Sequence, residues 1–129
     1  MASAFEKPTA LIVDDETLLR LHAADLLEDE GFSVLEAATA EEALELLAAS
    51  PDVKLLFTDI EMPGQLNGLD LARRVHERWP HILLIVTSGR LRPDRGEIPE
   101  PGRFVAKPYR DEELLGQVND LLHVENASI

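Results

Sequence analysis

Hydrophobic and polar positions alternate between two patterns along the chain. Short runs that are apolar at nearly every position predict buried β-strands, and the segments between them carry apolar residues every three or four positions, which predicts amphipathic helices. The predicted strands are residues 10–13, 32–37, 53–58, 82–87 and 103–106. The predicted helices run from Thr17 to near Gly31, from the capping box at Thr39 to near Ser50, and over about 69–79 and 111–123.

Strands of this kind, separated by amphipathic helices, are typical of a parallel sheet that is covered by helices on both faces. We therefore expect an α/β fold with a doubly wound, five-stranded parallel sheet, and one domain over residues 1–129 with its core at about 9–122. The segment 88–102 occupies the place of a fourth helix. Pro93, Pro99 and Pro101 and the lack of an apolar stripe predict at most a short or irregular helix there.

Length and composition support one soluble domain. The 129 residues are 45% hydrophobic, which is enough for a single core. The longest apolar run, residues 82–86, is much shorter than the roughly 20 residues of a membrane span. The first ten residues, MASAFEKPTA, contain an acid and a proline where a secretory signal has an apolar segment, so we expect a cytoplasmic protein. The absence of cysteine excludes disulfides and thiolate metal sites.

The chain is strongly acidic, with 25 Asp and Glu against 12 Lys and Arg and a formal charge of −13. A field of that sign repels phosphates, so we expect no nucleic-acid binding by this chain alone. Arg90, Arg92, Arg95 and Arg103 form a local exception. A solvated loop that offsets nearby acids is the favoured interpretation of these arginines, ahead of a dedicated anion or partner site.

Polar side chains follow four of the five predicted strands. Asp14 and Asp15 follow the first strand, Asp59 the third, Thr87 ends the fourth, and Lys107 follows the fifth. The carboxyl ends of parallel strands share one edge of the sheet, which is where ligands bind, so we expect these residues to converge. Each has an ordinary structural role when taken alone, such as a helix cap for Asp15 or a turn residue for Asp59. Those roles do not explain why all five fall on one edge.

Three converging carboxylates with one lysine form an unbalanced site. Carboxylates that lie close together take up protons unless a cation relieves their repulsion. Oxygen ligands with retained waters suit Mg²⁺ better than softer metals. A free aspartate oxygen is then a nucleophile for phosphorus, because aspartate forms acyl phosphates. Thr87 and Lys107 would stabilise the oxygens of the phosphoryl group.

Four motifs in order, LIVDDE, FTDIEMPG, LLIVTSG and FVAKPY, resemble the receiver domain of bacterial two-component response regulators over about residues 9–122. The resemblance implies a flavodoxin-like sheet with strand order 2-1-3-4-5, and a signalling module rather than an enzyme, apart from autophosphatase activity. It implies that a histidine kinase or phosphotransfer protein donates a phosphoryl group to Asp59, and that the output is contact with a downstream protein or phosphate relay.

The resemblance also implies a role for each remaining site residue. Asp15, Asp59 and the backbone carbonyl of Glu61 would bind Mg²⁺, with Asp14 acting mostly through water. Lys107 would contact the phosphoryl group, and the peptide bond that follows it, to Pro108, is typically cis in this family. The switch pair of the family falls on Thr87 and Phe104, although an ordinary core aromatic is an equally good interpretation of Phe104.

The sequence departs from the family pattern in three places. The loop MPGQLNG, which ends at Gly68, is one residue longer than the common form. The proline-rich segment 88–102 replaces the usual fourth helix, which belongs to the face through which many regulators dimerise. Phe104 stands where tyrosine is more frequent, so a ring hydroxyl is absent.

Two other functions are alternatives to a phosphorylated receiver. The first is a small Mg²⁺-dependent phosphatase with an aspartyl-phosphate intermediate. Its nucleophile would be Asp14, with a second aspartate two residues later, where this chain has Glu16. The chain also has no insertion that would close over a substrate and exclude water. The second alternative is an adaptor that has lost phosphorylation, and the intact acids and lysine argue against it.

Overall fold

The computed structural model describes the backbone of residues 7–127 and the side chains of residues 7–123. Five strands form one parallel sheet in the order β2-β1-β3-β4-β5, which confirms the predicted order and fold class. All five predicted strands are present, with small shifts at their ends. They are β1 (Thr9–Val13), β2 (Ser33–Ala37), β3 (Leu55–Asp59), β4 (Leu83–Ser88) and β5 (Arg103–Ala106).

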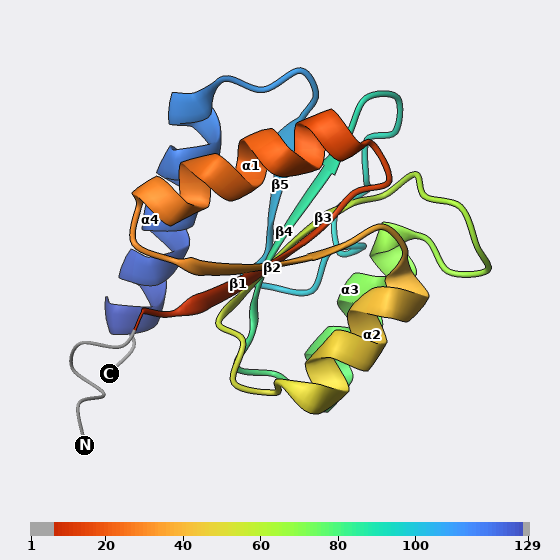
Figure 1. The fold of residues 1–129 in the computed structure, drawn as a ribbon, viewed down its shortest axis with the longest axis horizontal. Helices are drawn as coiled ribbons and strands as arrows, with labels where there is room; N and C mark the ends of the chain where they lie inside the picture. The colour runs from red at the N-terminus through yellow and green to blue at the C-terminus, as the bar shows by residue number, and fades with distance from the viewer. Residues whose placement is uncertain (1–6, 128–129) are drawn as a thin grey trace.

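Four helices cover the sheet, two on each face, so that the fold has three layers (Figure 1). Helices α1 (Thr17–Asp29) and α4 (Asp111–Ala127) lie on one face, and α2 (Ala40–Ala49) and α3 (Gly68–Arg78) lie on the other. Each matches a helix predicted from the sequence. None of the helices within residues 7–127 has the length and apolar character needed to cross a bilayer.

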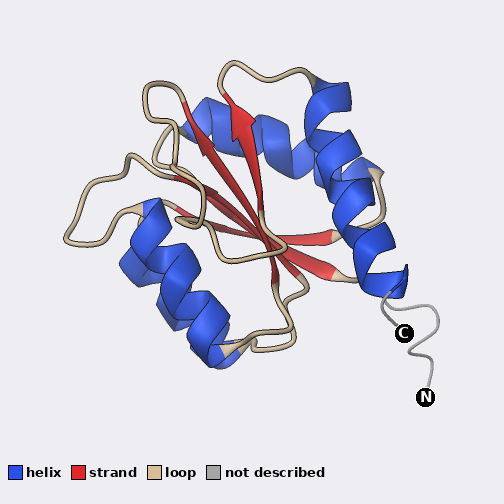
Figure 2. Ribbon diagram, turned by 180° about the vertical axis from the view of Figure 1, so that it is seen from behind, coloured by secondary structure: helices blue, strands red, loops and turns tan. Residues whose placement is uncertain are grey.

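The segment 89–102, between β4 and β5, forms turns and no helix, in keeping with its prolines (Figure 2). Ser88, the last residue of β4, anchors its start. The Ser88 hydroxyl oxygen accepts hydrogen bonds from the backbone N–H of Arg90 at 3.3 Å and of Leu91 at 2.9 Å. Further along, Ile98 packs against the core on the α2 and α3 side of the sheet. The segment is therefore held to the sheet by side chains rather than by a helix.

The two faces of the sheet have separate cores. Because successive side chains of a strand point to opposite faces, Leu11 and Leu56 pack with α2 and α3, whereas Ile12 and Phe57 pack with α1 and α4. Full burial of a side chain such as Leu56 contributes about 1.5–3 kcal/mol to stability. The strands are fixed on both faces, and their carboxyl ends are therefore held at defined positions.

Helices α1, α2 and α3 begin in three different ways. The Thr39 hydroxyl caps α2 by accepting from the N–H of Glu42 at 3.1 Å, but the Glu42 carboxylate accepts from Ala38, one residue before the cap, at 2.8 Å. Helix α3 starts with a full capping box between Asn67 and Asp70, which the sequence analysis did not predict. The N-cap of α1 is the residue after Asp15 and makes no side-chain cap bond, so Asp15 does not cap this helix.

Candidate functional site

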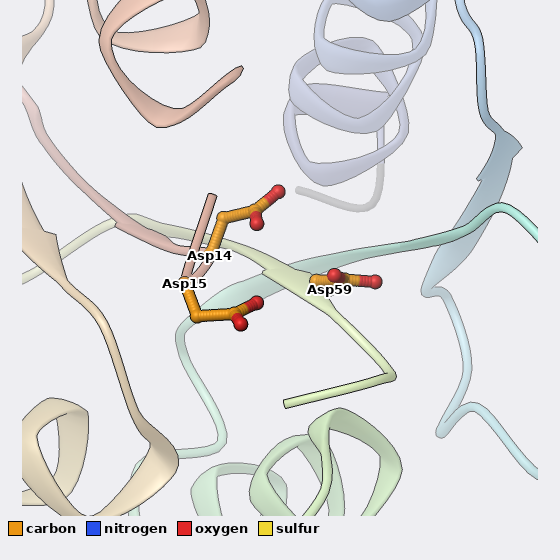
Figure 3. A group of neighbouring side chains, drawn as sticks. All are labelled: Asp14, Asp15 and Asp59. Atoms are coloured by element: carbon orange, nitrogen blue, oxygen red, sulfur yellow. The ribbon is translucent and has the colours of Figure 1, made fainter. Parts of the chain in front are cut away.

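The three predicted carboxylates meet at the carboxyl edge of the sheet (Figure 3). Strands β1 and β3 are adjacent, with Val13 paired to Thr58, so Asp14 and Asp59 leave the sheet side by side. Ligand oxygens of Asp14, Asp15 and Asp59 all lie within 4.8 Å of one another. Asp14 is 5% and Asp59 is 4% exposed, whereas Asp15 is exposed to solvent. This is the convergence that the strand ends predicted.

Gly68 lets the start of α3 pack directly on the backbone of Asp59. A β-carbon at Gly68 would lie only 1.9 Å from the carbonyl oxygen of Asp59, where no side chain fits. The Gly68 N–H donates to the carbonyl of Ile60 at 2.9 Å and closes the loop between β3 and α3. The end of this loop is therefore fixed against Asp59.

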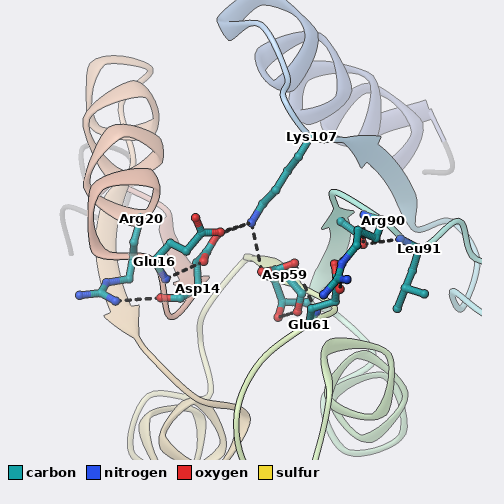
Figure 4. A network of polar contacts seen from close by, with 10 residues as sticks. Asp14, Glu16, Arg20, Asp59, Glu61, Arg90, Leu91 and Lys107 are labelled. Atoms are coloured by element: carbon teal, nitrogen blue, oxygen red, sulfur yellow. Dashed lines mark hydrogen bonds and ion pairs between the residues drawn. The ribbon is translucent and has the colours of Figure 1, made fainter.

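Lys107 is the central cation of the site (Figure 4). Its Nζ lies 3.1 Å from Oδ2 of Asp59, 3.2 Å from Oδ2 of Asp14 and 3.3 Å from Oε1 of Glu16. The lysine follows β5, and its backbone N–H donates to the carbonyl of Ser88 at 3.0 Å. The Lys107–Pro108 peptide bond is cis, as the family resemblance implied. The contact with Glu16 was not predicted.

Burial and neighbouring charges set the protonation states of Asp59 and Lys107. Burial raises the pKa of Asp59 above its ordinary value, and the negative charge of Asp14 raises it further, while the hydrogen bond and charge of Lys107 act in the opposite direction. Burial by itself lowers the pKa of Lys107, but its contacts with Asp59 and Asp14 outweigh burial and raise it. Lys107 is therefore charged at neutral pH. Its single positive charge does not balance the negative charges of the acids around it.

The donor set fits a hard divalent cation. Asp14, Asp15 and Asp59 offer only carboxylate oxygens, and Lys107 supplies one positive charge against their three negative charges. Glu61, whose backbone carbonyl was predicted as a ligand, lies beside them, and its N–H donates to Oδ1 of Asp59 at 3.3 Å. The chemistry of these donors favours Mg²⁺ over metals that prefer nitrogen or sulfur.

Thr87 is next to Asp59 in the sheet, and the two residues are register partners of β4 and β3. Thr87 is 2% exposed, and its hydroxyl oxygen has no hydrogen-bond partner among the described residues. An unpaired buried hydroxyl costs about 1–3 kcal/mol, so this group gains from any polar ligand that arrives within reach. Phe104, the other predicted switch residue, is partly buried against the α2 and α3 core, with the Cζ atom of Arg92 at 5.6 Å from its ring centroid.

Several residues of the site were missed from the sequence. The Glu61 carboxylate accepts from the Ser88 hydroxyl at 3.0 Å and pairs with Nε of Arg90 at 3.3 Å. The sequence contained one signal for Arg90, because it comes two residues after the end of β4 and therefore near the edge where the site residues meet. Among the other arginines of the group, Arg92 lies over Phe104, and Arg103 donates to the carbonyl of Pro101. The four arginines therefore do not form one anion site.

Two pockets, each of about 400 Å³, open at this edge of the sheet. The more apolar pocket includes Tyr109, whose ring meets that of Phe57 edge-on at 5.7 Å between centroids. Burial, followed by the charge of Asp14, raises the pKa of Tyr109 to about 12. The polar pocket contains the candidate site and is lined by Asp15, Glu16, Asp59, Glu61, Gly89, Arg90 and Lys107.

Comparison with known proteins identifies this arrangement. The family model of the response regulator receiver domain matches residues 10–119. The hydrogenase transcriptional regulatory protein HoxA of Cupriavidus necator is 34% identical over 127 residues, which cover 93% of this chain and 25% of HoxA. The transcriptional regulatory protein CpxR of Escherichia coli K12 is 34% identical over 114 residues, which cover 87% of this chain and 48% of CpxR. The chain thus spans half or less of these curated relatives.

Solved structures agree with the sequence relatives. A response regulator receiver protein from Sinorhizobium medicae WSM419 has a TM-score of 0.83 and 28% identity, covering 92% of this chain and 96% of that one. The receiver domain of the hybrid histidine kinase CckA has a TM-score of 0.76 and 30% identity, covering 88% and 98%. Receiver domains bind Mg²⁺ at a buried aspartate cluster and interact with histidine kinases or phosphotransfer proteins. The match to this family does not favour the alternative of a small phosphatase. The chain belongs to the receiver domain family of two-component response regulators.

Proposed function

We propose that Asp59 of this receiver domain is the phosphoacceptor. Two buried carboxylates, Asp14 and Asp59, contact the central lysine, and the observation that supports Asp59 most strongly is that it alone of these two lines the polar pocket. Lys107 lies 3.1 Å from Oδ2 of Asp59, and oxygens of Asp14 and Asp15 lie within 4.8 Å. The polar pocket gives a phosphoryl donor a path to Asp59.

In the proposed reaction, a carboxylate oxygen of Asp59 attacks the phosphorus of a phosphohistidine on a histidine kinase or phosphotransfer protein. The new O–P bond forms as the P–N bond breaks, and the imidazole leaves with the electron pair of that bond. Lys107 neutralises one phosphoryl oxygen in the transition state, and the Thr87 hydroxyl donates to another. The buried Thr87 hydroxyl has no partner within the described residues, which suits it to this role.

Magnesium is the proposed cofactor. Asp15, Asp59 and the backbone carbonyl of Glu61 would hold the ion, and Asp14 would act mostly through bound water. The ion would supply positive charge to the phosphoryl oxygens. Lys107 has an additional role, because its ammonium group also neutralises Asp59 and Asp14 before the phosphoryl group arrives.

The wider role follows from the same proposal. Residues 1–129 would act as a single receiver domain in the cytoplasm, without binding nucleic acid themselves, and signal by protein contact or phosphate relay. Thr87 and Phe104 would form the switch pair, with the hydroxyl moving to the phosphoryl group and the ring following inward. Attack of water on the acyl phosphate would release phosphate and restore Asp59, which is the proposed autophosphatase activity.

Incubation with Mg²⁺ and acetyl phosphate, followed by intact-mass measurement, tests the phosphoacceptor. We expect one phosphoryl adduct on the wild type and on Asp120→Ala, an exposed acid of α4 that serves as the control. Asp59→Ala, and the wild type with excess chelator, should show none. An adduct that persists on Asp59→Ala would overturn the assignment. Rapid turnover of varied phosphomonoesters would instead support the phosphatase.

A further inference from the structure

The Glu61 carboxylate joins two groups beside the phosphoacceptor. One oxygen accepts from the Ser88 hydroxyl at 3.0 Å, and the other lies 3.3 Å from Nε of Arg90. Figure 4 shows Glu61 and Arg90 next to Asp59, on the opposite side from the contact between Lys107 and Glu16. The family roles of Glu61, which concern its backbone carbonyl, leave the function of this side-chain pair unexplained.

Arg90 belongs to the wall of the polar pocket, together with Asp59 and Lys107. Its side chain is 87% exposed, and its ion pair with Glu61 is its only side-chain ion pair or hydrogen bond within residues 7–123. An exposed pair of this kind contributes no more than about 1 kcal/mol, so the guanidinium can exchange partners at low cost. Arg90 is thus a cation at the rim of the site that is only weakly held.

Charge favours a change of partner by Arg90 when Asp59 carries a phosphoryl group. Among the described residues, the carboxylates of Asp14, Glu16, Asp59 and Glu61 form ion pairs with two cations, Lys107 and Arg90. A third cation, Arg20, donates to the backbone carbonyl of Asp14 but pairs its charge with Glu36. An acyl phosphate on Asp59 replaces a single carboxylate charge by a group with nearly two negative charges, which repels Glu61. Guanidinium binds phosphate oxygens in a two-pronged geometry that its single contact with Glu61 does not use.

We propose that Arg90 is a second phosphoryl-binding residue of this domain, and that Glu61 holds it at the rim until a phosphoryl group on Asp59 takes it over. The inference rests on the proposed function and deepens it. Ser88 would transmit the exchange, because its hydroxyl donates to Glu61 and accepts from the N–H groups of Arg90 and Leu91. Loading of Asp59 would therefore reposition the start of segment 89–102, which in this domain replaces a helix.

Beryllofluoride, which imitates a phosphoryl group on an aspartate, provides the test in saturating Mg²⁺ by titration calorimetry. We expect Arg90→Gln to weaken its binding about fivefold. Arg95→Gln is the matched control: it lies in the same segment, makes the same change in charge and does not line the polar pocket, so it should bind like the wild type. Glu61→Gln should bind about two- to threefold more tightly, because the competitor for Arg90 is gone.

The double variant Glu61→Gln/Arg90→Gln separates an exchange from simple repulsion. If Arg90 moves between the two anions, the gain from Glu61→Gln shrinks when Arg90 is absent, which is a coupling that a double-mutant cycle measures. Equal gains in both backgrounds, or equal binding by Arg90→Gln and Arg95→Gln, would overturn the proposal for Arg90. Failure of the wild type to bind beryllofluoride and to form the acetyl phosphate adduct would instead overturn the role of Asp59 itself.

Discussion

Two connections flank Asp59, and they are held in different ways. The loop from β3 to α3 is fixed by the backbone: Gly68 packs on the carbonyl of Asp59, and the capping box of Asn67 starts the helix at once. The segment 89–102 after β4 leads into no helix and is tied by the side chain of Ser88 and by Ile98. The first connection therefore positions the phosphoacceptor, and the second is suited to respond to its state.

Gly68→Ala should break the backbone-held connection and have the largest effect. The added methyl group would overlap the Asp59 carbonyl, so we expect a loss of at least about 3 kcal/mol in the free energy of unfolding. Urea unfolding followed by fluorescence of Trp79, the only tryptophan, measures it. Gly116→Ala, in α4 with no atom near the new methyl group, is the control and should gain about 0.5–1 kcal/mol. Similar effects at both glycines would contradict the close packing.

A pH titration sharpens the comparison, because it tests burial and charge at this edge without altering either connection. Tyr109 has its pKa raised from 10 to about 12 by burial and by Asp14. Its contribution to stability is therefore complete below pH 10 and is lost as the pH rises through about 12, by at most about 3 kcal/mol. Tyr109→Phe should lack this loss. Parallel stability curves for the two proteins between pH 10 and 12 would show that the ring is not buried against the acids.

Lys107→Met removes the cation that lies between the two connections. It leaves Asp14 and Asp59 buried without a counter-charge, so we expect a loss of about 2 kcal/mol in metal-free buffer. Mg²⁺ should restore more stability to this variant than it adds to the wild type, because it compensates the same acids. Thermal unfolding with and without Mg²⁺ gives both values. Equal gains from Mg²⁺ would mean that Lys107 and the metal do not share these carboxylates.

Ser88→Ala tests the segment that is held by side chains, and its effect should be the smallest. The substitution removes the bond to Glu61 and the acceptor for the N–H of Leu91, at a cost of about 1 kcal/mol in unfolding free energy. Hydrogen exchange at Leu91 should speed up, while exchange at Gly68 in the other connection stays unchanged. Faster exchange in both connections would contradict their independence.

The strands and their ends could be predicted because the sequence encodes them locally. Runs such as residues 82–86 are apolar throughout, and a parallel sheet brings all carboxyl ends to one edge, so Asp14, Asp59 and Lys107 converge whatever the loops do. Cis geometry at Lys107–Pro108 followed from the family. Proline chemistry predicted at most a short or irregular helix over 88–102, and the structure has none there.

The side-chain pairs could not be predicted in the same way. The contacts of Arg90 with Glu61 and of Lys107 with Glu16 join segments far apart in the chain, and they depend on loop directions that no periodicity encodes. The start of α1 was misleading in a similar manner, because Asp15 has the residue type and position of a cap, yet the helix starts without a side-chain cap. Local pattern thus predicts where the site is, but not which rim residues surround it.

The central claim is that Asp59 carries the phosphoryl group as an acyl phosphate. Borohydride reduction after treatment with Mg²⁺ and acetyl phosphate tests it most directly, because the reagent reduces an acyl phosphate to an alcohol and thereby marks the residue permanently. Peptide sequencing by mass spectrometry should find Asp59 converted to homoserine, and no such change in chelator. Conversion of Asp14 or Asp15 instead, or an adduct that leaves every aspartate unreduced, would contradict the account.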